Sequence, residues 1–285
     1  MIIRNLTPGS EWLYFKIYTG IKTTDIILEE VIPSVLSYFQ ENNLILKWFF
    51  IRYSDPKPHL RIRFLLINSK EYNNILNYIH NVLDTYVESG EINNIQLDTY
   101  KRELERYGYK TIEDAESLFN MNSELTLDYL HLNDDEKIII ILFYIDRLLS
   151  QIGLSVNEKL QWIKDYNTSF KEEFNADKNL NQQLDKKYRA FSPKFLDFSQ
   201  SLESKEFRDL ILENLHLSND ALENICNSYD KDTNPRALQL FFQSIFHMAI
   251  NRMFISQQRL FEMIIYDYLH RYYKTLSYSK QNGEL

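Results

Sequence analysis

The sequence predicts an α+β protein: an N-terminal split β-α-β-β-α-β unit of the ferredoxin-like kind, followed by a mostly helical C-terminal part. Up to residue 110, short runs with β-type alternation are separated by two segments of helical periodicity, and from Thr111 onward the periodicity stays helical. Only six Gly and six Pro occur in 285 residues, which favours long helices over a loop-rich all-β fold. We place the division between residues 1–110 and 111–285 and expect the two parts to form one compact domain.

The N-terminal elements follow in the order of a split unit. Residues 11–19 are rich in β-formers and predict a strand that ends at Gly20. Thr23 and Asp25 can cap the next helix, in which Pro33 should cause a kink or a later start. Residues 48–64 predict a hairpin, residues 69–89 a second helix and residues 92–100 a fourth strand.

Breaks in the apolar pattern divide the C-terminal part into helices. A helix is expected over residues 112–130, and Asn133 should cap an apolar helix that is too charged at its ends to span a membrane. Further helices are expected over residues 156–173, 179–190, 193–200, 203–214, 218–228, 235–254 and 257–274. Without a long apolar run or the apolar core of a signal peptide, the expected location is the cytoplasm.

Charge and composition exclude several classes of function. Residues 1–110 carry 13 basic and 13 acidic side chains, whereas the remainder carries 19 and 27 and supplies the whole net charge of −8. Nucleic-acid binders usually show a basic excess, so direct binding of nucleic acid is not expected. The single Cys226 leaves no disulfide framework. No zinc, phosphate-loop or serine-nucleophile motif occurs, so we expect no metal and no cofactor.

The hairpin carries the first candidate site. After its turn, His59, Arg61 and Arg63 alternate with apolar residues and therefore share one face of a strand. Guanidinium groups bind carboxylates and phosphates bidentately, so this row predicts a site for an anion. The spacing alone equally allows a solvated face that is paired with local acids.

Two shorter motifs add further candidates. Glu103 and Arg106 lie three residues apart and can pair on one helical face, although a surface ion pair without function has the same spacing. His247 and Asn251 share a face of an apolar helix, with Arg252 beside them. A histidine in that setting is either a hydrogen-bonded core residue or an acid–base group.

Together these stretches resemble the C-terminal elimination domain of class I lantibiotic dehydratases, which also occurs alone as the thiopeptide-type bacteriocin biosynthesis domain. The resemblance covers nearly the whole chain. It rests on W-L-Y-F-K-I-Y from Trp12, F-I-R-Y-S-D-P-x-x-H-L-R-I-R-F from Phe50 to Phe64, Y-x-x-E-x-x-R-Y-G from Tyr100 to Gly108, and H-M-x-x-N-R from His247 to Arg252. Tyr109 stands where the family often has a second glycine, which leaves the shape of that loop open.

The resemblance implies an activity. In this family the full enzyme attaches glutamate from glutamyl-tRNA to Ser and Thr of a ribosomally made precursor peptide, and the C-terminal domain then eliminates the glutamate to leave dehydroalanine or dehydrobutyrine. We therefore expect a carbon–oxygen lyase that is the separate elimination subunit of a split dehydratase. The expected partners are a precursor peptide with its leader and a tRNA-dependent glutamyltransferase subunit, and a homodimer is left open.

The resemblance also assigns roles to residues. The expected elimination residues are Arg61, Arg63, Glu103, Arg106 and His247. β-Elimination needs a base, stabilisation of enolate-like charge and a site for the departing glutamate, and these side chains suit those tasks. Substrate binding is expected from His59, Arg52, Asn251 and Arg252.

Two alternatives stay open on the same fold. Some standalone members of the family are pyridine synthases, which join two dehydroalanines by a formal 4+2 cyclisation and release the leader peptide. They tend to lack the ionic residues, so the presence of these residues here favours elimination. A non-catalytic partner would only present the precursor peptide, for which an exposed strand edge could capture a leader segment. All three hypotheses, the lyase, the pyridine synthase and the non-catalytic partner, require a peptide-binding groove.

Overall fold

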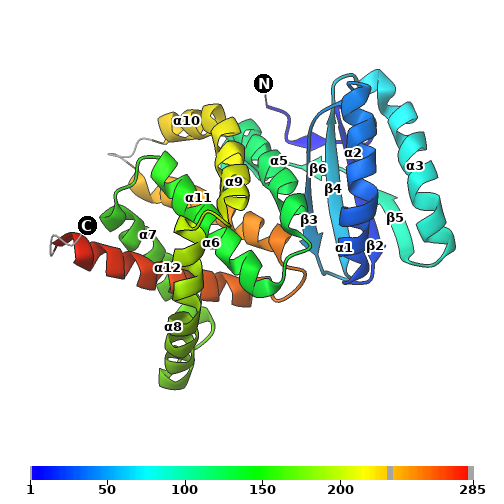
Figure 1. Cartoon of the computed structure of the whole chain (residues 1–285). Coiled ribbons are helices and arrows are strands. Elements are labelled where there is room, and N and C mark those ends of the chain that lie inside the picture. Colours follow the sequence, from blue (N-terminus) through cyan, green and yellow to red (C-terminus); the bar gives the residue numbers. More distant parts are fainter. Residues whose placement is uncertain (1, 230–233, 282–285) are drawn as a thin grey trace. The chain divides into compact units, whose positions relative to one another are not determined.

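The protein is described by a computed structural model over residues 2–229 and 234–281, which fold into two compact units (Figure 1). The first unit contains the described residues up to His131 together with Asn251–Ser256, and the second contains Leu132–Ile250 and the residues from Gln257 onward. Every strand in the described residues lies in the first unit, and helices make up the second. The predicted α+β class is confirmed. The predicted domain division at residue 110 stays a prediction.

The first unit is built on a four-stranded antiparallel sheet of order β3-β4-β2-β5. The strands are β2 (Trp12–Thr19), β3 (Ile45–Tyr53), β4 (His59–Leu66) and β5 (Ile92–Leu97). The crossovers are α1 (Thr23–Ile26) with α2 (Ile32–Glu41), and α3 (Tyr72–Glu88), drawn in blue and cyan in Figure 1. The first and third strands of the unit lie in the middle of the sheet, as the ferredoxin-like order requires.

Pro33 explains why the first crossover is not one regular α-helix. A π-helical turn over Ile27–Val31 precedes α2, and Pro33 occupies the first turn of α2. Because residues 27–31 are helical, Pro33 removes a donor from a continuous helical run, and the adjoining π-helical turn accommodates that loss. The helical run begins at Thr23, so the expected later start is not observed, and the irregularity near Pro33 is instead this π-helical turn.

The two faces of the sheet differ in character. Leu60, Ile62 and Phe64 of β4 are almost fully buried, in a core cluster shared with residues of α2 and α3. The opposite face carries Arg61 and Arg63, as the alternation along β4 predicted. This opposite face therefore holds His59, Arg61 and Arg63, whereas Arg52 of β3 lies on the face of Leu60.

Side chains hydrogen-bond to the outer edge of β3. From α5 (Ile112–Tyr129), Asn120 Oδ1 accepts from the amide of Trp48 at 2.7 Å, and Ser123 Oγ accepts from the amide of Phe50 at 3.3 Å. These acceptors take the place of a neighbouring strand, so the β3 edge is closed.

The end of α11 (Pro235–Met253) completes this edge. Asn251 Oδ1 accepts from the amide of Arg52 at 2.9 Å, and Asn251 Nδ2 donates to the carbonyl of Arg52 at 3.0 Å. Arg252 Nε donates to the carbonyl of Phe50 at 2.8 Å. The Arg52 side chain donates to the carbonyl of Arg252 at 2.9 Å and pairs with Asp25 at 2.5 Å.

The second unit is a set of helices. They are α6 (Asp134–Gln151), α7 (Val156–Glu173), α8 (Lys178–Gln200), α9 (Lys205–Leu217), α10 (Asn219–Ser228), most of α11, and α12 (Gln258–Gln281). Of these, α6, α7 and α8 have side-chain N-caps. Asn133 caps α6 through reciprocal hydrogen bonds with Glu136, as predicted. No helix in the described ranges is long and apolar enough to cross a membrane.

The predicted break at Pro193 is wrong. The sequence predicted separate helices over residues 179–190 and 193–200, but α8 is one helix that passes through Pro193. The proline removes one backbone hydrogen bond, at a cost of about 3 kcal/mol. Phe191, Phe195 and Phe198 are buried on this helix. Burying each ring contributes about 1.5–3 kcal/mol, which offsets that loss.

We expect Asn251→Ala to lower the free energy of unfolding by about 1–3 kcal/mol, because the buried amide and carbonyl of Arg52 would lose their partner. Urea unfolding measures this change, with Asn77→Ala on the exposed side of α3 as the control. Equal midpoints for the two variants would contradict the structural role of Asn251.

Candidate functional site

Among the residues that the structure describes, Arg63 is a buried cation without a carboxylate partner. The residue is 7% exposed, and its guanidinium carbon lies 4.2 Å, 4.8 Å and 5.2 Å from the ring centres of Tyr14, Tyr100 and Phe49. Among the described residues, its Nε has no hydrogen-bond partner and no carboxylate lies within ion-pair distance. Burial lowers the pKa of Arg63, and the more distant carboxylate of Glu103 acts in the opposite direction.

Arg61 continues the row and is less buried. Its guanidinium carbon lies 3.5 Å from the ring centre of Tyr53, and its Nε donates to His59 Nε2 at 3.0 Å. His59 Nδ1 in turn donates to the carbonyl of Lys57 at 2.8 Å. Burial lowers the pKa of His59, as does the charge of Arg61. A neutral His59 that fixes the direction of Arg61 fits these contacts.

Lys16 belongs to the same row, and the sequence reasoning missed it. On β2 it stands opposite Arg61 of β4 and opposite Gln96 of β5. Its ammonium pairs with Asp98. Burial raises the pKa of Asp98, but hydrogen bonds from Lys16 and the Thr99 amide outweigh that effect and lower the pKa. The only sequence signal was a lysine in a β-type run, because the register between strands cannot be read from sequence.

Glu103 and Arg106 form the predicted pair on α4 (Leu104–Tyr107). Arg106 Nε lies 3.2 Å from the Glu103 carboxylate, and both side chains are about half exposed. Solvent screens such a pair, so it contributes little to stability. The charge of Glu103 nevertheless acts to raise the pKa of Arg63 on β4. Arg106 also acts on Tyr107, although burial dominates and raises the pKa of Tyr107 to about 12.

A buried ion pair holds the segment that precedes α4. The short strands β1 (Asn5–Leu6) and β6 (Tyr100–Lys101) pair with each other. Arg102 donates to both carboxylate oxygens of Glu116 at 2.7 Å, and the Tyr100 hydroxyl donates to the same carboxylate at 2.8 Å. Tyr100 is thereby fixed as one of the rings around Arg63.

In the second unit, His247 forms a dyad with a buried carboxylate. Its Nδ1 lies 2.9 Å from Oε1 of Glu262, which is 1% exposed, while the imidazole is one-third exposed. Arg259 donates to Oε2 of Glu262 at 2.8 Å and also pairs with Glu173. If Nδ1 donates to Glu262, Nε2 keeps a free lone pair and can act as a base. Glu262 lay outside every motif read from the sequence.

The structure brings some of the predicted residues together. Arg61, Arg63, Glu103 and Arg106 lie in the first unit, and His247 lies in the second. His59 contacts Arg61, whereas Arg52, Asn251 and Arg252 form hydrogen bonds at the edge of β3. A role of these last three residues in substrate binding stays a prediction.

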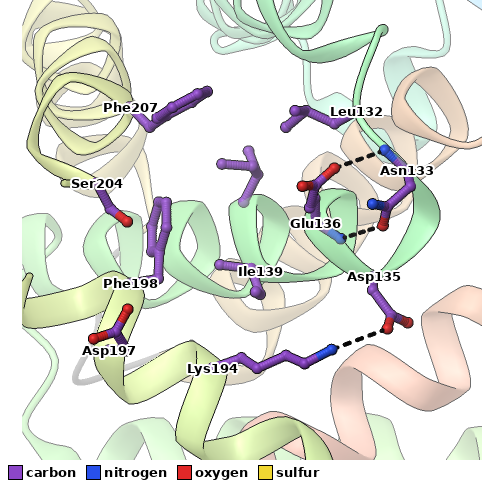
Figure 2. A pocket seen from close by; sticks show the side chains of 11 residues that line it. Leu132, Asn133, Asp135, Glu136, Ile139, Lys194, Asp197, Phe198, Ser204 and Phe207 are labelled. Atoms are coloured by element: carbon purple, nitrogen blue, oxygen red, sulfur yellow. Dashed lines mark hydrogen bonds and ion pairs between the residues drawn. The ribbon is translucent and has the colours of Figure 1, made fainter.

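The second unit also contains a cavity of about 410 Å³ among α6, α8 and α9. Figure 2 shows its apolar wall with Phe198, Phe207 and Ile139 and, at its rim, the ion pair between Asp135 and Lys194 at 3.6 Å. None of the predicted site residues lines it. Within residues 2–229 and 234–281, no group of His, Cys, Asp and Glu could hold a metal ion.

Residues 12–273 match the profile of the family described as lantibiotic biosynthesis dehydratase C-term. The chain belongs to this family. The recognition made from the four motifs is thereby confirmed. Members of this family take part in dehydration in lantibiotic biosynthesis.

Relatives of this dehydratase family match nearly the whole chain. The chain is 26% identical over 286 residues to nisin biosynthesis protein NisB of Lactococcus lactis subsp. lactis, covering 97% of the chain and 27% of NisB. It is 24% identical over 291 residues to subtilin biosynthesis protein SpaB of Bacillus subtilis, covering 98% of the chain and 27% of SpaB. The chain thus spans about a quarter of the length of these relatives.

Two solved structures share the fold. The tRNA-dependent lantibiotic dehydratase MibB from Microbispora sp. 107891 gives a TM-score of 0.71 at 18% identity, over 98% of this chain and 29% of MibB. The pyridine synthase TbtD from thiomuracin biosynthesis gives 0.58 at 13% identity, over 93% of this chain and 100% of TbtD. At these identities the likeness concerns the fold.

The unpaired state of Arg63 can be tested by comparing two buried arginines. Arg63→Met should leave the unfolding midpoint unchanged or raise it, because it removes a desolvated charge that no carboxylate of the described residues balances. Arg102→Met should lower the free energy of unfolding by about 3–5 kcal/mol, because it leaves the Glu116 carboxylate buried and unpaired. Urea unfolding distinguishes the two, and an equal loss in both variants would show that Arg63 has a purely structural role.

Proposed function

We propose that this chain eliminates glutamate from O-glutamyl-Ser and O-glutamyl-Thr of a ribosomally made precursor peptide, leaving dehydroalanine and dehydrobutyrine. Arg63 is the observation that carries the proposal, because it is a desolvated guanidinium for which the described part of the chain supplies no carboxylate partner. It lies on a sheet face that also presents Arg61 and Lys16. A departing glutamate brings the carboxylates that such a face would bind.

The reaction places specific demands on the residues. A base removes the Cα proton, the electrons form the double bond between Cα and Cβ, and the bond from Cβ to the ester oxygen breaks. Negative charge develops first next to Cα and then on the leaving carboxylate. Arg63 and Arg61 are suited to stabilise that charge, because they are oriented before substrate arrives by aromatic rings and by His59.

Proton transfer is assigned to His247. Its hydrogen bond to Glu262 orients the imidazole and places the free lone pair on Nε2. Arg259 holds Glu262 from the other side. In the first unit, the half-exposed side chain of Arg106 can contact the glutamyl group, and its ion pair with Glu103 restricts the orientation of its guanidinium. A separate tRNA-dependent subunit would supply the glutamylated peptide.

The pyridine synthase reading is the alternative on the same fold, since TbtD shares it. The two activities differ in the mass of the product. A lyase removes glutamate from a glutamylated peptide, whereas a pyridine synthase removes the leader from a peptide that is already dehydrated. Supplying both peptides in separate reactions distinguishes them.

We expect His247→Ala to lower the rate of glutamate release from a synthetic O-glutamyl-serine peptide by about 10²-fold or more, because it removes the proton-transferring group. Mass spectrometry would show accumulated glutamylated peptide. Exposed His80→Ala on α3 is the control and should match the unmodified chain. Normal dehydration by the His247 variant would remove His247 from the mechanism.

Glu262→Gln tests the positioning role of the carboxylate. The amide can donate to Nδ1 and so favour the wrong imidazole tautomer, and we expect a loss in rate on the order of 10²-fold with little change in peptide binding. Glu172→Gln, exposed on α7, is the matched control. An NMR titration of the His247 ring would follow the tautomer directly, and an unchanged tautomer with unchanged rate would refute the positioning role.

A further inference from the structure

The two edges of the sheet are not equivalent. The β3 edge is closed by side chains of α5 and α11. At the other edge, β5 pairs with no described strand except β2, and Figure 1 shows it as a terminal strand of the sheet. In the described part of the chain, no group other than β2 hydrogen-bonds to the backbone of residues 94–97. Asn94, Gln96 and Leu97 are exposed.

The register shows which backbone groups face outward. The Asp98 amide donates to the carbonyl of Tyr14 at 3.2 Å, so Tyr14 and every second residue after it on β2 face β5. Asn94 and Gln96 are opposite such residues and direct their backbone groups toward β2. Ile95 and Leu97 then direct their N–H and C=O groups away from the sheet.

This edge lacks the usual protection against strand pairing. Residues 92–97 contain no charged residue and no proline. The irregularity in the pairing of β5 with β2 lies at the start of β5, where the register shifts between Tyr18 and Thr19. Residues 94–97 are therefore a regular, uncharged and open template for another strand.

We propose that the outer edge of β5 binds an extended segment of the precursor peptide by strand addition, in an inference that rests on the proposed function. The row Arg61, Lys16 and Gln96 crosses the sheet on one face from β4 to β5. An added strand would continue this row at roughly 14 Å from β4, given a strand spacing of about 4.8 Å. About five extended residues then reach from the docked segment to Arg61.

A peptide fits this edge better than a second copy of the chain does. Two β5 edges that paired with each other would share four residues per copy, far short of the roughly 1,200 Å² buried in a specific interface. An extended peptide needs only the backbone groups for affinity, and it gains a further contact where its glutamyl group meets the arginines. The edge therefore sets the distance from the docked segment to the modified residue.

The test uses a fluorescent synthetic peptide with an alternating valine–threonine segment followed, about five residues later, by serine or O-glutamyl-serine. Leu97→Pro removes an outward N–H and keeps the hydrogen bonds to β2, and we expect at least tenfold weaker binding of both peptides by fluorescence anisotropy. Gln96→Ala keeps all backbone groups and should bind like the unmodified chain. Circular dichroism checks that both variants fold.

A second measurement uses the unmodified chain. Two peptides are compared, one N-methylated at the odd-numbered residues of the segment and the other at the even-numbered residues. Only one of the two should lose binding, because the amides of an added strand point alternately toward β5 and away from it. Equal binding of the two methylated peptides would overturn the proposal, as would unchanged binding of the peptide to Leu97→Pro. A dimer that ultracentrifugation detects and that Leu97→Pro dissociates would also overturn it. Binding at the edge without glutamate release would instead refute only the lyase, and glutamate release with no contribution from the edge would refute only strand addition.

Discussion

The candidate site depends on a guanidinium that the fold desolvates without placing a carboxylate of residues 2–229 or 234–281 beside it. Taking such a charge out of water costs several kcal/mol, and rings stacked against it return only part of that cost. Arg63 is held in this state by Tyr14, Phe49 and Tyr100, with Glu103 acting at longer range. An anion that entered would restore the missing interaction, which supports the proposed binding of a carboxylate at Arg63.

The surrounding structure prevents other groups from satisfying Arg63. Glu116 is occupied by Arg102 and Tyr100, and Asp98 is occupied by Lys16. At the β3 edge, the side chain of Asn251 makes the two hydrogen bonds to the Arg52 backbone that a neighbouring strand would otherwise make. In the second unit, Glu262 is shared by His247 and Arg259. Glu116, Asp98 and Glu262 are therefore already paired with cationic side chains.

Local patterns were sufficient to predict the sheet and to suggest the row on β4, because alternation along one strand is visible in sequence. They also revealed the family, since four short motifs occur in the right order. They could not show that Arg63 is buried and Arg106 is not, because burial depends on Tyr14 and Tyr100 from other strands. Lys16 and Glu262 were missed since register and helix packing set their contacts. The helix break at Pro193 was wrong because aromatic burial outweighed a local preference.

The most direct measurement is the mass of a synthetic peptide bearing O-glutamyl-serine after incubation with this chain in the absence of tRNA. If the unpaired cation and the histidine act on a departing glutamate, the peptide should lose one glutamic acid and gain a dehydroalanine that reacts with an added thiol. An unchanged mass with a folded chain, or cleavage of a leader from a dehydrated peptide instead, would contradict elimination as the function.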